Sequence, residues 1–271
     1  MKKIISIAMI LVLVASMSFA LIPLNVKAAN TSTSDNYTAI NDTTVKVKGP
    51  VIDTPPDLSA PDPVPYYAVG TVVRWVTANL YTGQYFSAYF KLMANGTNAE
   101  IWVACDASGT PALNWPSGDP RPTPVILANE ISFLLNETDS LIYPTDVQYF
   151  GAPAVRDGTL AHYGPAGRFT GSTRLVILVE NIRDENFYDP TYPYYVAGFF
   201  ESNIGPYYAD RNVITIDSYH WEYRLGPLGT IWTDSIAVSR PYVYDSTIAH
   251  EFQHLIHADW NPGDDTFMNE G

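Results

Sequence analysis

Cysteine is almost absent from this sequence, since Cys105 is the only one among 271 residues. One thiol cannot form a disulfide within the chain, so stability must come from packing or from bound metal. Cys105 follows the apolar run Ile101–Ala104. We therefore expect a small buried side chain at this position rather than a nucleophile.

Basic residues are also scarce, with 15 Lys and Arg against 28 Asp and Glu. Three of the basic residues fall within the first 29 positions, which leaves 12 basic and 28 acidic residues after them, a formal charge of −16. This balance argues against nucleic acid and against anionic membrane surfaces as partners.

One long apolar run lies at the N-terminus, where residues 4–24 follow Met1-Lys2-Lys3. A basic start, an apolar run and small residues at Ala28 and Ala29 predict a secretory signal peptide over residues 1–29. The protein is therefore expected to be secreted or held at the extracellular cell surface. The alternative is an uncleaved membrane anchor, because the run approaches spanning length.

Residues 30–65 contain few large apolar side chains and much Ser, Thr, Asn, Asp and Pro. This composition predicts a linker or a short propeptide. Three glycosylation sequons lie in this segment and two lie beyond it, which predicts a glycoprotein. The five acceptor positions are Asn30, Asn36, Asn41, Asn95 and Asn136.

From residue 66 onward, strand-like runs alternate with turns, and one helical segment separates them. The expected strands are Val69–Val76, Tyr85–Leu92, Glu100–Ala104, Arg174–Asn181, Tyr194–Phe200 and Asn212–Asp217. The first three form an antiparallel meander. Thr123 is expected to cap a helix from Pro124 to about Thr138, and Asp146–Phe150 to form a short second piece.

This order of elements predicts an α+β domain with a mixed twisted sheet over residues 66–271. Five successive apolar residues within Arg174–Asn181 indicate a central strand that is buried on both faces. A strand at the border of a cleft can bind an extended peptide by pairing with it. Tyr194–Phe200 and Asn212–Asp217 are both candidates for that edge.

The segment Ser246–His257 contains the pattern H-E-x-x-H, formed by His250, Glu251 and His254. On a helix, positions i and i+4 lie one above the other, so two imidazoles can converge on one zinc ion. Glu251 then lies beside the position of the attacking water and can act as its general base. The pattern predicts a catalytic zinc site.

The surrounding residues favour a helix here. Asp245 or Ser246 can serve as the N-cap, and Asn261-Pro262-Gly263 ends the segment. An apolar stripe at helical spacing is expected to face the core. It consists of Ile248, Phe252, Leu255 and Ile256.

A catalytic zinc ion usually has three protein ligands, and Glu270 is the first candidate for the third. His257 and Asp265 rank behind it, and Asp259 and Asp264 are further oxygen donors. Calcium is a possible second ion. Its candidate ligands Asp184, Glu185 and Asp189 lack the spacing of a calcium loop, so an exposed turn is the better interpretation.

The segment from Ser246 through His250-Glu-Phe-Gln-His254, followed by Asn269-Glu270-Gly271, resembles the hyicolysin-type secreted neutral zinc metallopeptidases. These belong to the zincin superfamily with a glutamate third ligand. The resemblance extends to Glu100–Ala104, Leu141–Gly151 and Arg211–Asp217. The immune-inhibitor-A-like secreted metalloproteases are the second choice.

The resemblance implies a zinc endopeptidase that hydrolyses peptide or protein substrates. It matches His250, His254 and Glu270 to the ligands and Glu251 to the base. It also implies a second lobe that carries the oxyanion-stabilising residue. Because the sequence stops at Gly271, we expect a truncated catalytic domain whose C-terminal lobe is missing.

The competing hypothesis is a non-catalytic extracellular or cell-surface envelope protein with a structural or degenerate metal site. The signal peptide, the sequons and the acidic composition fit this hypothesis equally well. Glu251 argues against it, because a structural site needs ligands but no base between them.

Overall fold

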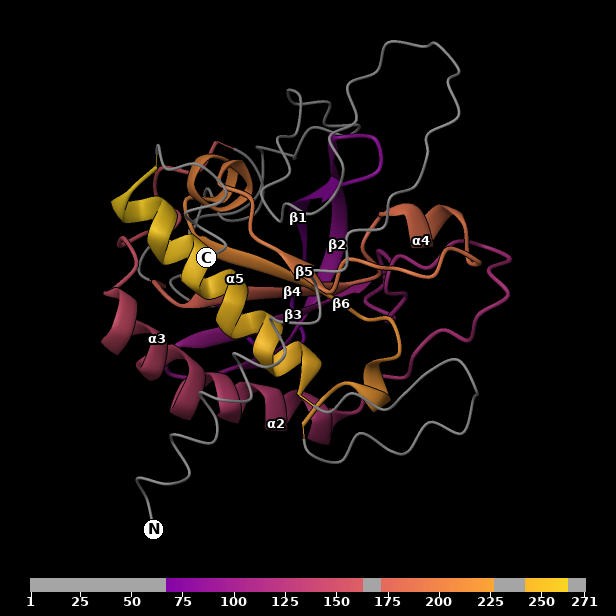
Figure 1. Cartoon of the computed structure of the whole chain (residues 1–271), viewed down its shortest axis with the longest axis horizontal. Helices are drawn as coiled ribbons and strands as arrows, with labels where there is room; N and C mark the ends of the chain where they lie inside the picture. Colours follow the sequence, from indigo (N-terminus) through magenta and orange to yellow (C-terminus); the bar gives the residue numbers. More distant parts are fainter. Residues whose placement is uncertain (1–66, 163–171, 227–241, 263–271) are drawn as a thin grey trace, which may run out of the picture. The chain divides into compact units, whose positions relative to one another are not determined.

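The computed structural model describes residues 67–162, 172–226 and 242–262. They form an α+β fold built on one curled, mixed sheet of six strands in the order β1-β2-β3-β4-β6-β5 (Figure 1). The predicted signal peptide and the linker or propeptide lie outside the described residues. The predicted α+β class is confirmed.

The first three strands form the antiparallel meander that the sequence predicts. They are β1 (Val72–Asn79), β2 (Gln84–Asn95) and β3 (Ala99–Cys105). Cys105 is 5% exposed, and burial raises the pKa of its thiol to about 11. The predicted burial of this side chain is therefore confirmed.

The centre of the sheet consists of parallel strands. β4 (Leu175–Glu180) lies between β3 and β6 (Asn212–Asp217), and every residue of β4 and β6 is buried. The predicted central strand is thus confirmed. Of the two candidates for the edge, Asn212–Asp217 is excluded, because β6 lies between β4 and β5 in the sheet.

The edge strand is β5 (Gly198–Phe199), which pairs antiparallel with β6. It is shorter than the predicted strand Tyr194–Phe200. The amide of Val196 donates to the Asp184 carboxylate at 2.7 Å rather than to a neighbouring strand. A side-chain acceptor therefore replaces the ladder over the first part of that segment.

Helices cover one face of the sheet. One continuous helical run consists of α2 (Ala128–Glu137), η1 (Thr138–Ile142) and α3 (Tyr143–Phe150). The helix α5 (Val243–Trp260) packs beside this run on the same face of the sheet (Figure 1). The predicted separate piece Asp146–Phe150 is therefore part of a longer helical run. The shorter elements are α4 (Glu185–Tyr188), η3 (Asn203–Ala209) and η4 (Trp221–Tyr223).

The start of α2 differs from the prediction. Thr123 does not cap it, because the helix begins four residues after Pro124. The Glu130 carboxylate instead accepts from the amide of Leu127 at 2.8 Å. A glutamate in the first turn thus fixes the helix start, as in one half of a capping box.

Each face of the sheet carries its own hydrophobic core. Val176 and Leu178 of β4 point into the core shared with β1, β2 and η3. Ile177 and Val179 point into the core shared with α2, α3 and α5. The second core holds α5 against the sheet and thereby places the predicted zinc motif.

The curl of the sheet brings the end of β1 back to the end of β4. Asn79 forms an isolated parallel bridge with Arg183, and the amide of Tyr81 donates to the Arg183 carbonyl at 3.0 Å. The Thr77 hydroxyl also donates to the buried Glu180 carboxylate. Within the described part of the chain, no helix has the length and apolar character needed to span a membrane.

Candidate zinc and active site

The helix α5 carries the H-E-x-x-H pattern, and it starts two residues before Asp245. Its N-cap is Tyr242, which adopts a left-handed conformation with φ 61°. Asp245 does not cap it, because its carboxylate accepts from the amide of Gly226 at 2.9 Å. Asn261 is the C-cap, so the predicted end of the helix is confirmed.

The predicted apolar stripe of α5 is confirmed, since Ile248, Phe252, Leu255 and Ile256 are all fully buried. The Phe252 ring stacks on Tyr143 of α3 with centroids 4.9 Å apart. Packing on both the sheet and α3 fixes the rotation of α5 about its axis. The direction of its histidines is fixed with it.

His250 and His254 converge as the sequence predicts. Their Nε2 atoms are 2.9 Å apart, and their rings lie nearly perpendicular at 79°. Two nitrogens that bind one tetrahedral Zn²⁺ lie about 3.3 Å apart, given Zn–N bonds of about 2.0–2.1 Å. A small opening of the two rings would therefore make room for the ion. His254 is 1% exposed, whereas His250 is half-buried.

Glu251 is 2% exposed and lies where α5 meets the edge strand. A Cβ built on Gly198 would come within 3.5 Å of Glu251 Cγ, 2.8 Å of the Thr215 carbonyl oxygen and 2.4 Å of Thr247 Cγ2. Only glycine allows β5 to approach α5 this closely. The sequence analysis did not identify Gly198, whose role depends on a contact between distant segments.

In the described part of the chain, no candidate for a third ligand converges with the two histidines. Across residues 67–162, 172–226 and 242–262, no group of three His, Cys, Asp or Glu could hold a metal ion. Glu270, Asp264 and Asp265 lie outside these ranges. His257 is half-buried in the last turn of α5.

Asp259 has a structural role instead of a ligand role. Its carboxylate forms an ion pair with Arg156 and accepts from the amide of Ala154 at 2.7 Å. Its side chain is 7% exposed. This pairing joins the last turn of α5 to the loop after α3, so Asp259 is removed from the candidate ligands.

The acidic loop considered for calcium is organised by hydrogen bonds. Asp184 caps α4 by accepting from the amide of Phe187 at 2.9 Å, and it is buried rather than exposed. Asp189 accepts from the amide of Thr191 at 2.9 Å. These carboxylates are used within the loop, so calcium gains no support.

Two further buried carboxylates were missed by the sequence analysis. Glu180 ends β4 and Asp217 ends β6, where they face each other across the strand pair. Burial raises the pKa of Glu180 to about 7 and that of Asp217 well above its usual value. Acidic residues at the ends of apolar strands were the signal that could have identified them.

No protein-family model matches the sequence, and no curated protein matches it either. Function therefore has to be inferred from the residues and their geometry.

Proposed function

We propose that this chain is the zincin-like lobe of a secreted zinc endopeptidase of the hyicolysin type, with the immune-inhibitor-A type as second choice. The observation that carries the proposal is the convergence of the His250 and His254 Nε2 atoms at 2.9 Å, one helical turn apart. The buried carboxylate of Glu251 next to them supplies the base that a structural site does not need.

His250 and His254 would hold the zinc ion through their Nε2 atoms, and we propose Glu270 as the third ligand. The ion would lower the pKa of a water molecule and polarise the scissile carbonyl. Glu251 accepts the proton of the attacking water and then gives it to the leaving amine. Its place on a rigid, packed helix keeps this carboxylate in one position between the two steps.

We propose that an extended peptide substrate pairs with the edge strand β5. The Ala197 carbonyl accepts from the amide of Asp217 at 2.8 Å, so residues 197 and 217 form a hydrogen-bonded antiparallel pair. Hydrogen-bonded pairs alternate along such a ladder, and Gly198 therefore points its own amide and carbonyl away from β6. A peptide that pairs with Gly198 would lie against the Glu251 end of the site.

The test is Glu251→Gln, which keeps the size of the side chain and removes the base. We expect zinc content to remain at the wild-type level and the rate of casein or peptide hydrolysis to fall by about 10²–10⁴-fold. Gln253→Ala, two residues along the same helix, serves as the matched control and should hydrolyse at nearly the wild-type rate. Unchanged hydrolysis by Glu251→Gln would show that Glu251 is not the base.

A further inference from the structure

A half-buried arginine follows η4 close to the start of α5. The guanidinium of Arg224 lies over the Tyr195 ring, 4.9 Å from its centroid. Its Nε is buried and has no hydrogen-bond acceptor. Among the residues that the structure describes, no carboxylate lies within ion-pair distance of Arg224, although four ion pairs form elsewhere.

The other charged groups near Arg224 in the described part of the chain are bonded elsewhere, buried or exposed to solvent. Arg121 also lies over a neighbouring ring, that of Tyr219, but it pairs with Asp119 at 2.7 Å. Asp217 is fully buried and accepts from the backbone amides of Ile182 and Tyr219. Asp245 is bonded to the amide of Gly226, and Glu222 is exposed beside Tyr223. Within residues 67–162, 172–226 and 242–262, the charge of Arg224 is therefore not balanced by a local ion pair.

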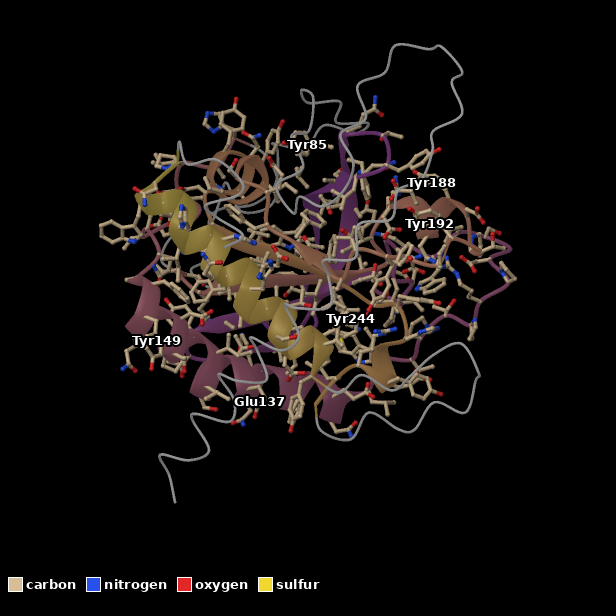
Figure 2. All side chains as sticks on the ribbon, in the orientation of Figure 1. Tyr85, Glu137, Tyr149, Tyr188, Tyr192 and Tyr244 are labelled. Carbon is tan, nitrogen blue, oxygen red and sulfur yellow. The ribbon has the colours of Figure 1, made fainter. Side chains whose placement is uncertain are left out.

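This charge lies beside the segment that leads into the edge strand. The Tyr195 ring packs edge-on against Tyr219 with centroids 5.1 Å apart, and the Tyr219 carbonyl accepts from the hydroxyl of Tyr244, which Figure 2 shows near the N-terminal end of α5. Two residues later the Ala197 carbonyl is paired with β6, and Gly198 then meets Glu251. Three residues of extended chain cover about 10 Å. We therefore place Arg224 a few residues along the edge from the proposed reacting bond.

We propose that Arg224, oriented by the Tyr195 ring, binds a carboxylate of the substrate at this end of β5. A guanidinium on an aromatic face keeps its outer N–H groups free for a two-point contact with a carboxylate. The position of this carboxylate relative to the reacting bond rests on the proposed function, whereas the binding of a carboxylate by Arg224 does not. The carboxylate is an Asp or Glu side chain, or the C-terminal group of a short peptide.

Three sets of octapeptides in an alanine background test the proposal. One set is N-acetylated and C-amidated with a single Asp at each position in turn, the second carries Asn instead, and the third carries Asn with a free C-terminus. We expect the Asp peptide at one position, or the free-carboxylate peptide, to bind wild type about tenfold more tightly than its neutral counterpart. In Arg224→Gln this preference should vanish while the neutral peptide binds as before.

Two measurements separate this inference from the proposed function. Binding is followed by calorimetry on the zinc-loaded chain with Glu251→Gln, so that no hydrolysis is required, and cleavage is followed on the wild type. A carboxylate preference that depends on Arg224 would support the carboxylate site whether or not cleavage is seen, whereas a protein that joins this lobe to the implied C-terminal lobe and still cleaves no peptide would refute the peptidase proposal. Equal affinity of the wild type for charged and neutral peptides would refute the proposal that Arg224 binds a carboxylate.

Arg74→Gln is the matched control, because it removes the same charge from β1, at the opposite edge of the sheet from β5. It should leave the preference unchanged. If Arg224→Gln weakens charged and neutral peptides equally, Arg224 acts only on the local structure and the proposal fails. A loss of preference in Arg74→Gln of the same size would assign the effect to net charge and also overturn it.

Discussion

At the scale of single residues, the site is defined by which side chains of α5 are already committed to other contacts. Asp259 is held by Arg156 and the backbone of Ala154. His250 and His254 meet each other through Nε2. The chemistry of the helix therefore concentrates in one turn, from His250 to His254, rather than along its whole polar side.

Measured zinc affinities should distinguish the proposed ligands from neighbouring residues of α5. We expect His254→Ala to weaken zinc affinity by at least about a hundredfold, since it removes one of two converging nitrogens. His257→Ala, on the same helix, is the control and should bind zinc like wild type. Both are measured by competition with a chromophoric chelator.

The same assay decides the third ligand. Glu270→Ala should lose tight zinc binding as His254→Ala does. Retention of zinc by Glu270→Ala together with its loss in His257→Ala would replace Glu270 by His257 as the ligand.

At the scale of elements, β5 packs against α5 at Gly198 with no room for a side chain. Gly198→Ala would place a methyl group 2.4 Å from Thr247 Cγ2 and 2.8 Å from the Thr215 carbonyl oxygen. We expect a loss of about 1–3 kcal/mol in the free energy of unfolding, because neither element can move without disturbing a packed core. Urea denaturation followed by circular dichroism measures it.

A second substitution tests the cause of that loss. Thr247→Ala removes the methyl group that Gly198→Ala would meet, so the double variant should recover part of the stability. A double variant whose losses simply add would show that the two residues do not interact.

Local sequence patterns predicted the elements that depend on local signals. The meander, β4, β6 and the apolar stripe of α5 follow from hydrophobic runs and periodicity, and all are confirmed. The starts of α2 and α5 and the length of β5 were wrong. In each case a side chain bonds differently from its local pattern: Glu130 to Leu127, Asp245 to Gly226, Asp184 to Val196.

The site divides in the same way. His250, Glu251 and His254 could be found from spacing alone, because the helix itself brings them together. Gly198 and Arg224 could not be found in this way, because their roles depend on contacts between distant segments. Gly198 of β5 meets α5, and Arg224 meets Tyr195. Sequence spacing thus identifies the turn that we propose to be catalytic, but not the residues along which we propose that a substrate binds.

At the scale of the whole molecule, buried carboxylates make stability depend on pH. Burial raises the pKa of Glu180 to about 7 and that of Asp184 to about 6. The folded chain then keeps protons that the unfolded chain has released. The contribution of these two carboxyl groups to the free energy of unfolding is fully present below about pH 4, and it is lost as the pH rises through about 6 to 7.

The free energy of unfolding should therefore fall between about pH 4 and pH 7, by up to about 1.4 kcal/mol per pH unit for each group. In Glu180→Gln the decline should be shallower, as measured from urea transitions at several pH values. Glu222→Gln removes a charge from an exposed position and should keep the wild-type slope. An equal slope in Glu180→Gln would contradict the assignment.

The curl that joins β1 to the end of β4 has a consequence for how the chain acquires its structure. Thr77 and Glu180 are 103 residues apart in sequence, yet their side chains share a hydrogen bond. The meander alone leaves one face of β1 and β2 uncovered until β4, η3 and β6 have been synthesised. Contacts at such long sequence separation slow folding, and a ribosome-bound nascent chain that ends before residue 217 should expose this apolar face to chaperones.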